Sequence, residues 1–330
     1  MSKLKLTFGC WNYDRTRALA DGSVVADGID LNYLDMPVEE TFFRMLRNQE
    51  FDVAELSLSS YTVSLFRSPQ PFVAIPVFPS RFFRHSCIYV NATSGIRKPT
   101  DLIGRRIGNP EYQMTAPVWI RGILSDHYAV PVDSVTYVTG GEEEPGRSEK
   151  LKLDLPPSIR VERIGPEQTL AQMLRDGEID ALYTARAPSS FRAGDGRVVR
   201  LFPDYREIER DYYRSTGIFP IMHTVAIRRD VYDANRWIAQ SLQKAFIAAQ
   251  AKTYVDLKES AALKAMLPWL NHHVEEAIAE MGEDYWPYGF ARNRATLDTF
   301  LRYHHEQGLS KRRLAPEDLF APESLEAFRI

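Results

Sequence analysis

The sequence contains few cysteines and no long apolar run. Only Cys10 and Cys87 occur among its 330 residues. Both lie in or beside strand-like stretches, which predicts small buried thiols in a reducing compartment rather than a disulfide framework. Neither thiol has a catalytic base in its local sequence. No stretch approaches the roughly 20 apolar residues that span a membrane, so no membrane association is expected.

Cofactor motifs are also missing. The sequence has no Walker loop, no dinucleotide-binding glycine fingerprint and no zinc-type cysteine cluster. We therefore expect no organic cofactor, while a divalent metal remains open. The net charge of −3 gives no reason to expect a nucleic-acid partner.

The N-terminal segment reads directly as a strand. In MSKLKLTFGCWNYD, Leu4, Leu6 and Phe8 alternate with polar residues. No basic segment followed by an apolar stretch is present, so no secretion signal is visible. The expected location is therefore the cytoplasm.

What the sequence does contain is the composition of a globular protein with more than one core. It is 44% hydrophobic and 26% charged, and 330 residues exceed what one core normally supports. The first half alternates short apolar strands with amphipathic stretches, as parallel α/β sheets do. From Asn235 onward the pattern is mostly helical, including NRWIAQSLQKAFIAAQAKTYV and ESAALKAMLPWL.

A short internal repeat indicates that one helix–turn–strand unit occurs twice. MLRNQEFDVAEL at 45–56 aligns with MLRDGEIDALYT at 173–184. Chance similarity is the alternative, because this phrase is common in α/β proteins. Each copy is followed by a small polar loop, at 57–60 and 185–190. Ligands of open α/β sheets bind beyond the carboxyl ends of strands, so the two loops predict a cleft between two lobes.

The same pattern predicts the lobe boundaries. We expect lobe 1 to comprise residues 1–86 and 224–330, and lobe 2 to comprise residues 87–223, with the substrate cleft between them. The two crossings, RHSCIYVN and MHTVAIRR, each carry a histidine, His85 and His223. Both histidines would then lie near the hinge.

Several segments together resemble one known family. DLIGRRIGNPEYQMT resembles a phrase frequent in the type II periplasmic-binding-protein superfamily, and the match is closer to its 4,5-dihydroxyphthalate decarboxylase branch. The segments that carry this match span most of residues 8–191 and are CWNYDRTRAL, FDVAELSLSSY, PVFPSRFFRHSCIYVN, PEYQMTAPVWIRGIL, GGEEEPGR and GEIDALYTARAPSSF.

The resemblance implies both a fold and an activity. The fold is α/β and two-lobed, with a mixed sheet flanked by helices in each lobe and two crossing strands between the lobes. The activity is that of a cytosolic carboxy-lyase converting 4,5-dihydroxyphthalate, a small aromatic dicarboxylate, to protocatechuate and carbon dioxide. Two alternatives stay open: a non-catalytic solute-binding or sensor protein for an aromatic or dicarboxylic acid, and a decarboxylase of a related hydroxylated benzoate.

The chemistry of such a decarboxylation defines the groups that the site needs. Direct loss of carbon dioxide would leave an unstable aryl carbanion. Protonating the ring carbon that bears the departing carboxylate avoids this, and a para hydroxyl that loses its proton makes that step feasible. The site therefore needs an acid at the ring carbon, an acceptor at the phenol and cations that hold the remaining carboxylate.

Three residues are candidates for proton transfer. His85 lies in PSRFFRHS at the first predicted crossing, and His223 lies at the second. For each, a buried structural histidine is the alternative. Glu111, just before the helix expected near Thr115, could accept a phenolic proton; the alternative is a solvated loop carboxylate.

The candidate substrate-binding residues are arginines and hydroxyl-bearing residues near the expected strand ends. Surface arginines and ordinary turn or cap serines are the corresponding alternatives. Arg84 and His85 would point to opposite faces of an extended strand, so we do not expect the whole first crossing to line the cleft. The predicted binding residues are Arg15, Ser57, Ser59, Ser60, Arg81, Arg84, Tyr112, Arg186 and Ser189.

One aromatic segment has two interpretations. DYWPYGF at 284–290 would suit either a wall of the cleft or a subunit interface. The second interpretation would make the protein a homo-oligomer.

Overall fold

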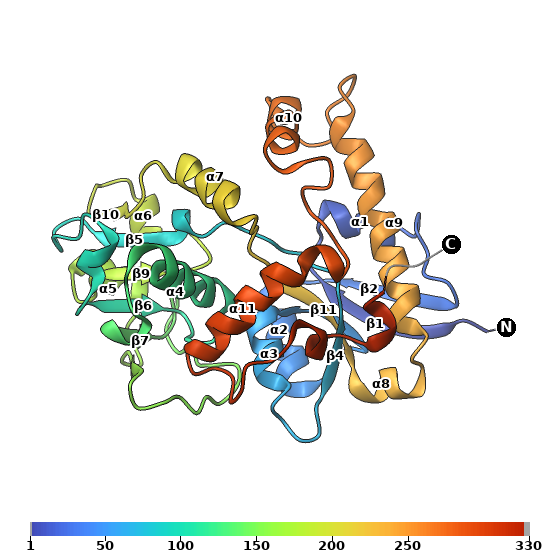
Figure 1. Ribbon diagram of the computed structural model, residues 1–330, viewed down its shortest axis with the longest axis horizontal. Helices are drawn as coiled ribbons and strands as arrows, with labels where there is room; N and C mark the ends of the chain where they lie inside the picture. The colour runs from blue at the N-terminus through green and yellow to red at the C-terminus, as the bar shows by residue number, and fades with distance from the viewer. Residues whose placement is uncertain (1, 327–330) are drawn as a thin grey trace. The chain divides into compact units, whose positions relative to one another are not determined.

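The computed structural model, which describes residues 2–326, divides the chain into two units, each built on its own β-sheet (Figure 1). Unit 1 contains the chain up to Arg81, Ile221–Leu297 and the chain from Ala315, and unit 2 contains Phe82–Pro220 and Asp298–Leu314. The predicted boundaries after residues 86 and 223 lie a few residues beyond these. The prediction also placed all of 224–330 in lobe 1, whereas Asp298–Leu314 groups with unit 2.

Unit 1 contains a five-stranded mixed sheet with the order β2-β1-β3-β11-β4. β1 runs parallel to β2 and β3, while β11 is antiparallel to β3 and β4. The strands are β1 (Leu4–Cys10), β2 (Ile29–Asp35), β3 (Val53–Ser57), β4 (Phe72–Ile75) and β11 (His223–Arg228). The alternation predicted for β1 is present, because Leu6 and Phe8 are buried.

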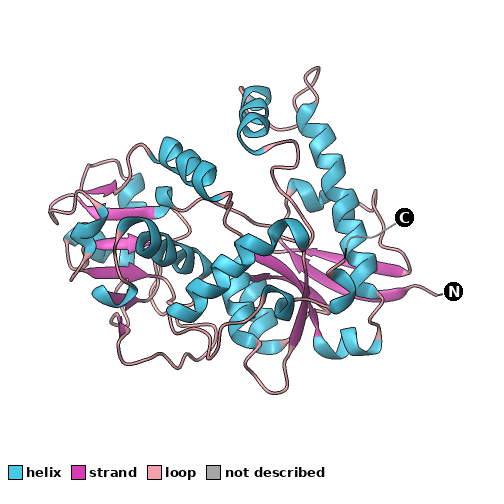
Figure 2. Cartoon of the chain, viewed as in Figure 1, coloured by secondary structure: helices cyan, strands magenta, loops and turns pink. Residues whose placement is uncertain are grey.

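Helices flank this sheet (Figure 2). They are α1 (Asp14–Ala20), α2 (Val38–Asn48), α3 (Leu58–Ser64), α8 (Arg229–Ala234), α9 (Ile238–Lys258) and the start of α11 (Arg294–Glu306). α10 (Leu270–Met281) packs against α9 and stands away from the sheet (Figure 1). Phe8 makes edge contacts with Tyr33 and with Phe246 of α9, at centroid distances of 5.1 Å and 5.4 Å. This aromatic contact joins α9 to the sheet.

Unit 2 contains a six-stranded mixed sheet with the order β10-β5-β9-β6-β7-β8. β6 is parallel to β7 and β9, and β5 is antiparallel to β9 and β10. The strands are β5 (Ile88–Asn91), β6 (Arg106–Asn109), β7 (Thr136–Thr139), β8 (Arg160–Arg163), β9 (Ala181–Tyr183) and β10 (Val198–Arg200). The helices are α4 (Thr115–Tyr128), α5 (Leu170–Asp176), α6 (Ser189–Arg192) and α7 (Tyr205–Thr216), together with most of α11.

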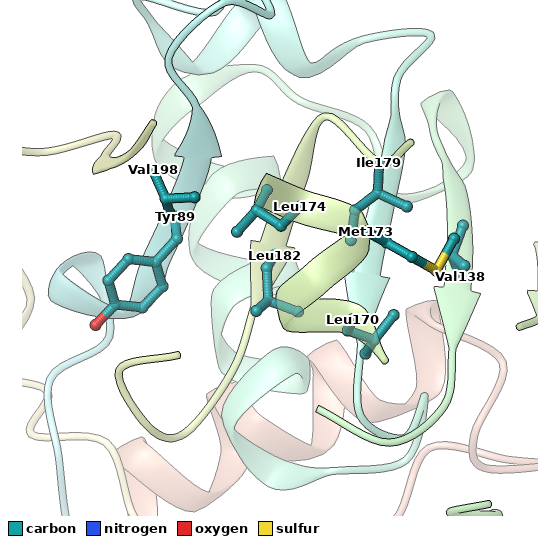
Figure 3. Close-up of a cluster of buried hydrophobic side chains, with 8 residues drawn as sticks. All are labelled: Tyr89, Val138, Leu170, Met173, Leu174, Ile179, Leu182 and Val198. Atoms are coloured by element: carbon teal, nitrogen blue, oxygen red, sulfur yellow. The ribbon is translucent and has the colours of Figure 1, made fainter. Parts of the chain in front are cut away.

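A hydrophobic cluster fixes α5 against this sheet (Figure 3). Its members are buried side chains from α5, from the strands and from the loop before β9, and they are Tyr89, Val138, Leu170, Met173, Leu174, Ile179, Leu182 and Val198. Burial of this apolar surface is the main force that holds the helix to the sheet.

The end of α11 belongs to unit 2 because it packs on α4. Tyr303 lies edge-on to Trp119 at 5.7 Å, and its hydroxyl donates to Asp126 at 2.7 Å. Arg302 forms an ion pair with the same carboxylate. These contacts explain the difference from the predicted division, because the sequence does not show which sheet a returning helix will cover.

Two predicted elements also differ locally. The expected first crossing strand begins instead with a 3-10 turn, His85–Cys87, before β5. The expected helix over residues 259–270 is irregular up to Trp269. Pro268 lacks the N–H that an interior helical position needs, and Met266 and Trp269 are exposed, so no buried face stabilises a helix there.

The connections between the units run antiparallel beside each other. Arg81 forms an isolated antiparallel bridge with Ile221, and Met222 N–H donates to Ser80 O at 2.8 Å. Phe82 N–H donates to Pro220 O at 3.1 Å. Each helix among the described residues is too short or too polar to cross a membrane.

Candidate active site

Polar side chains gather at one edge of the unit 1 sheet. β1 and β3 are parallel, so their carboxyl ends reach the same edge, and the antiparallel β11 begins there. His223, the first residue of β11, pairs in the ladder with Ser57, the last residue of β3. We call this edge, with the loop that follows β1, the carboxyl edge of unit 1. Such edges are where open α/β sheets bind ligands.

Glu55 of β3 is the centre of this edge. Its side chain has no exposed surface, and two partners approach it at 2.6 Å, the Tyr13 hydroxyl and His223 Nδ1. The Trp11 N–H donates to it at 3.2 Å and the Cys10 thiol at 3.5 Å. A carboxylate can accept all of these contacts.

The protonation states follow from these contacts. Burial by itself would raise the pKa of Glu55, but the charge of His223 and the hydrogen bonds from His223, Tyr13 and Trp11 hold that pKa below its usual value. Burial and the charge of Glu55 raise the pKa of Tyr13 far above its usual value. Glu55 is therefore ionised, and Tyr13 keeps its proton and donates it.

An ionised Glu55 determines which tautomer His223 adopts. A carboxylate can only accept, so the hydrogen of the neutral imidazole is on Nδ1. The other ring nitrogen, Nε2, is then the atom that gains or loses a proton. The side chain of His223 is 16% exposed, and the ring of Phe42 packs edge-on against it at 4.8 Å. This is the arrangement of a proton-carrying imidazole held by a carboxylate.

Arg15 supplies a fixed cation on the same unit. Its guanidinium lies over the rings of Tyr13 and Trp286, at 4.0 Å and 4.4 Å from their centroids. Nη1 forms an ion pair with Asp14 at 3.0 Å, and Nε donates to Pro79 O. Trp286 belongs to the aromatic segment 284–290, so that segment packs against this arginine. Two rings restrict the side chain, which suits it to bind a carboxylate.

The predicted serines lie at the start of helix α3. Ser57 Oγ accepts from the Ser60 N–H at 3.5 Å and caps α3. Ser59 and Ser60 are fully buried. Among the described residues, no hydrogen-bond partner is found for Ser60 Oγ. The structure therefore places Ser57 opposite His223 in the sheet ladder, in a capping role, and Ser59 and Ser60 in the first turn of α3.

The three basic residues of PSRFFRHS lie in different surroundings. Arg81, in unit 1, is 3% exposed and donates to Pro287 O at 2.8 Å and to Asn293 Oδ1. Arg84, in unit 2, is buried with its guanidinium 4.8 Å from the Phe82 ring centroid, and it donates to Ala185 O at 3.5 Å.

His85 lies in an aromatic pocket within unit 2. Its side chain is 1% exposed, and three rings surround it at 5.3 to 5.7 Å, those of Tyr128, Phe202 and Tyr212. Neither ring nitrogen has a hydrogen-bond partner within residues 2–326. Burial, with a smaller contribution from the charge of His127, lowers the pKa of His85 to about 4. The imidazole is neutral near pH 7.

A second polar edge occurs in unit 2, where parallel β6, β7 and β9 end. Glu111 is fully buried there and forms ion pairs with Arg147, at 2.7 Å, and with Lys150. Tyr112 is also fully buried, and its hydroxyl donates to Gln307 O at 3.0 Å. Both predicted residues are thus occupied by contacts within the unit.

The other predicted residues of this edge are exposed. Ser189 N–H donates to Glu143 at 2.7 Å, and Arg186 N–H donates to Thr184 Oγ1 at 3.3 Å. The Thr184 hydroxyl in turn donates to Glu142. Burial raises the pKa of Glu142 to about 7, against the effect of that hydrogen bond.

Sequence reasoning missed Glu55, Tyr13 and Glu142. A signal existed for Glu55, because it is the one charged residue in the apolar strand VAELS, where burial needs compensation. Glu142 stands in a run of three consecutive glutamates after a strand, a pattern that fits a solvated loop equally well. Within the described part of the chain, no group of three or more His, Cys, Asp or Glu residues is arranged to hold a metal ion.

Solved structures define the class of fold. The periplasmic sulfonate-binding protein SsuA from Methylobacillus flagellatus matches with a TM-score of 0.54 at 13% identity, covering 98% of this chain and 93% of that one. The aliphatic sulphonate-binding protein SsuA from Escherichia coli matches with a TM-score of 0.53 at 13% identity, covering 98% and 99%. The chain therefore has the two-lobed type II periplasmic-binding-protein fold, as predicted.

Sequence relatives define the family. The 4,5-dihydroxyphthalate decarboxylase of Comamonas testosteroni is 44% identical over 330 residues, which is 100% of both chains. The Pseudomonas putida protein of the same name is 45% identical over 215 residues, covering 65% of this chain and 83% of its own. No protein-family model matches the sequence. The chain belongs to the 4,5-dihydroxyphthalate decarboxylase family and is a carboxy-lyase, which confirms the predicted resemblance.

Proposed function

We propose that this protein decarboxylates 4,5-dihydroxyphthalate to protocatechuate and carbon dioxide, with His223 as the proton carrier. The observation that supports the substrate is the 44% identity to the Comamonas testosteroni decarboxylase over the whole length of both chains. The observation that supports the role of His223 is its 2.6 Å contact with an ionised, buried carboxylate.

The reaction consumes one proton and releases one carbon dioxide. Nε2 of the protonated His223 donates to the ring carbon that bears the departing carboxylate. The bond between that carbon and the carboxylate then breaks, its electron pair restores the aromatic ring, and carbon dioxide leaves. His223 regains its proton from solvent. Glu55 stays ionised throughout and stabilises the imidazolium before the transfer.

Arg15 is proposed to bind the carboxylate that stays on the ring. Arg15 is a cation on the same unit as His223. Tyr13 lies between Arg15 and the Glu55–His223 pair, because its ring packs on Arg15 and its hydroxyl donates to Glu55. A guanidinium can donate two parallel hydrogen bonds to a carboxylate. The retained carboxylate would thereby orient the ring.

His223 is a better candidate than His85 because of their partners. His223 has a carboxylate that can stabilise its charged form, whereas aromatic rings surround His85 and burial disfavours its charge. The proton-transfer role of Glu111 stays a prediction, as does a cytoplasmic location. Binding roles also stay predictions for Tyr112, Arg186, Ser189, Arg81, Arg84, Ser57, Ser59 and Ser60.

One assay tests the proposal against its alternatives. Purified protein is incubated with 4,5-dihydroxyphthalate in deuterium oxide, and carbon dioxide and protocatechuate are followed. We expect one deuterium at the vacated ring carbon. Binding without carbon dioxide release would favour a solute-binding or sensor protein. Faster turnover of a hydroxylated benzoate that lacks the second carboxylate would favour the other decarboxylase.

The role of His223 is tested by replacement. His223→Asn should lower kcat by about 100-fold to 10,000-fold, the usual contribution of a general acid or base. His272→Asn is the matched control, because His272 is 65% exposed on α10. An H223N protein with wild-type kcat would contradict the assignment and leave the substrate proposal untouched.

A further inference from the structure

We propose that Glu55 is a positioning residue, which acts on the reaction through His223 by fixing the tautomer of the imidazole and stabilising its charged form. This inference rests on the proposed role of His223 as the proton carrier. Glu55 would not itself touch the substrate.

The position of Glu55 is rigid. Its backbone lies in the middle of the unit 1 sheet, where Glu55 pairs with Val225 of β11, two residues beyond His223. The carboxylate and the imidazole therefore come from neighbouring strands of one ladder. A contact of 2.6 Å between two such strands varies little, because neither side chain depends on a loop for its position.

The partners of Glu55 require a negative charge. Tyr13, Trp11 and Cys10 each donate to the carboxylate, and His223 is the fourth partner. An amide at this position would turn its NH₂ group toward at least one donor. A buried carboxylate is costly to desolvate, so a purely structural core position would be occupied at lower cost by an apolar residue.

The other titratable groups around Glu55 leave it as the negative charge beside His223. Cys10 on β1 and Tyr13 after it face Glu55, and burial, with the charge of Glu55, raises the pKa of both. Burial also raises the pKa of Tyr33 on β2. These three groups are therefore neutral at physiological pH. Arg15 adds a positive charge beyond Tyr13, so Glu55 is the anion in direct contact with His223.

Two variants give opposite expectations. Glu55→Gln removes the negative charge in contact with Nδ1, so the imidazolium loses a stabilising partner and the alkaline limb of the kcat/KM profile moves to lower pH. Tyr13→Phe keeps the carboxylate and removes a donor that shares the same oxygen, Oε1. The carboxylate then interacts more strongly with His223, and the limb moves to higher pH.

A nitrogen-15 spectrum of the seven imidazoles provides a readout apart from activity. The His223 signals are assigned by their loss in H223N. We expect the wild-type protein and Y13F to show hydrogen on Nδ1, and E55Q to lose or weaken that signal. Asp52→Asn is the matched control, because Asp52 also bonds across the sheet, to Thr7 at 2.8 Å, and lies outside the cluster.

The outcomes separate this inference from the proposed function. An unchanged His223 signal in E55Q overturns the inference, as does a loss of activity by the same factor at every pH. If E55Q does not fold, the Y13F variant tests the proposal instead. An alkaline limb of its kcat/KM profile that does not move, or that moves to lower pH, counts against the proposal. If the wild-type protein does not decarboxylate 4,5-dihydroxyphthalate, the proposed function fails, while the spectra still decide the role of Glu55.

Discussion

His85 and His223 have the same side chain and opposite surroundings. The carboxylate of Glu55 contacts the ring of His223 at 2.6 Å. Three aromatic rings surround His85, and its nitrogens have no hydrogen-bond partner among the described residues. The first environment suits a residue that exchanges protons, and the second suits one that stays neutral.

The neutral state of His85 should make stability depend on pH. Its pKa is lowered to about 4 in the folded protein from 6.5 in the unfolded chain. The unfolded chain therefore binds a proton that the folded protein does not bind between these values. The contribution is fully present above pH 6.5 and is lost as pH falls toward 4, and its size is about 3 kcal/mol.

His85→Phe tests this directly. Phenylalanine fills the pocket without ring nitrogens, so the free energy of unfolding should equal or exceed that of wild type at pH 7, and the difference should grow as pH falls toward 4.5. Urea unfolding at several pH values measures this, with His272→Phe as an exposed control. Equal pH slopes for wild type and H85F would contradict the prediction, and loss of turnover in H85F would support the catalytic role predicted from sequence.

At the residue scale, the sequence does not show whether a polar side chain takes part in chemistry or is simply buried. The sequence showed that His85 and Arg84 lie near a crossing, but two of the three rings that surround His85 belong to Phe202 and Tyr212, more than a hundred positions away. Glu55 was visible as a charge inside an apolar strand. Its partners, from β1 and β11, became apparent only when the strand order was known.

Among the elements, helix α4 shows how close two helices can approach. A Cβ added at Gly122 would lie 2.1 Å from the Tyr303 ring, whose position is held by Trp119 and Asp126. Because the ring is held on both sides, it cannot move away without breaking these contacts. Gly122 is thus required by the packing of α11 on α4.

Gly122→Ala should therefore destabilise the protein, although alanine normally favours a helix by about 1 kcal/mol. We expect a loss of about 1 to 3 kcal/mol, the usual cost of overpacking. Ser125→Ala on the same helix is the control. Thermal unfolding measures both variants, and a G122A protein as stable as wild type would show that the end of α11 does not pack on α4 as described.

Elements with their own strong pattern were predictable. The alternation in β1, the proline in the first turn of α4 and the long apolar periodicity of α9 are local signals, and all three elements are present. The irregular stretch before α10 and the 3-10 turn at His85–Cys87 were not predicted. Both depend on whether a neighbouring surface buries the segment, which the local pattern does not contain.

For the whole molecule, the order of strands and helices along the chain was sufficient to predict two α/β units, whereas the family was predicted from the resemblance of particular segments such as CWNYDRTRAL and GEIDALYTARAPSSF. The membership of Asp298–Leu314 in unit 2 was not predictable, because the chain returns there through α11 without a break in the helical pattern. Long-range packing decides the division.

Measuring how a ligand stabilises the whole protein should distinguish residues that bind the substrate from residues that transfer the proton. A ligand that binds only the folded state stabilises it by about 2.7 kcal/mol at one hundred times its Kd. Phthalate lacks the hydroxyl groups that the reaction needs, so it can occupy a carboxylate site without being consumed. We expect phthalate to raise the Tm of wild-type protein and of H223N equally, because His223 is assigned to proton transfer and not to binding.

Arg15→Ala should instead weaken the effect of phthalate. A lost charged hydrogen bond costs about 1.5 to 3 kcal/mol, which corresponds to a Kd roughly ten to a hundred times higher. Arg17→Ala, an exposed arginine on the same helix, should keep the wild-type shift in Tm. Differential scanning fluorimetry over a range of phthalate concentrations compares the four proteins. If R15A and R17A respond alike, Arg15 does not hold the carboxylate, and the cation of the site must be sought among the other predicted arginines.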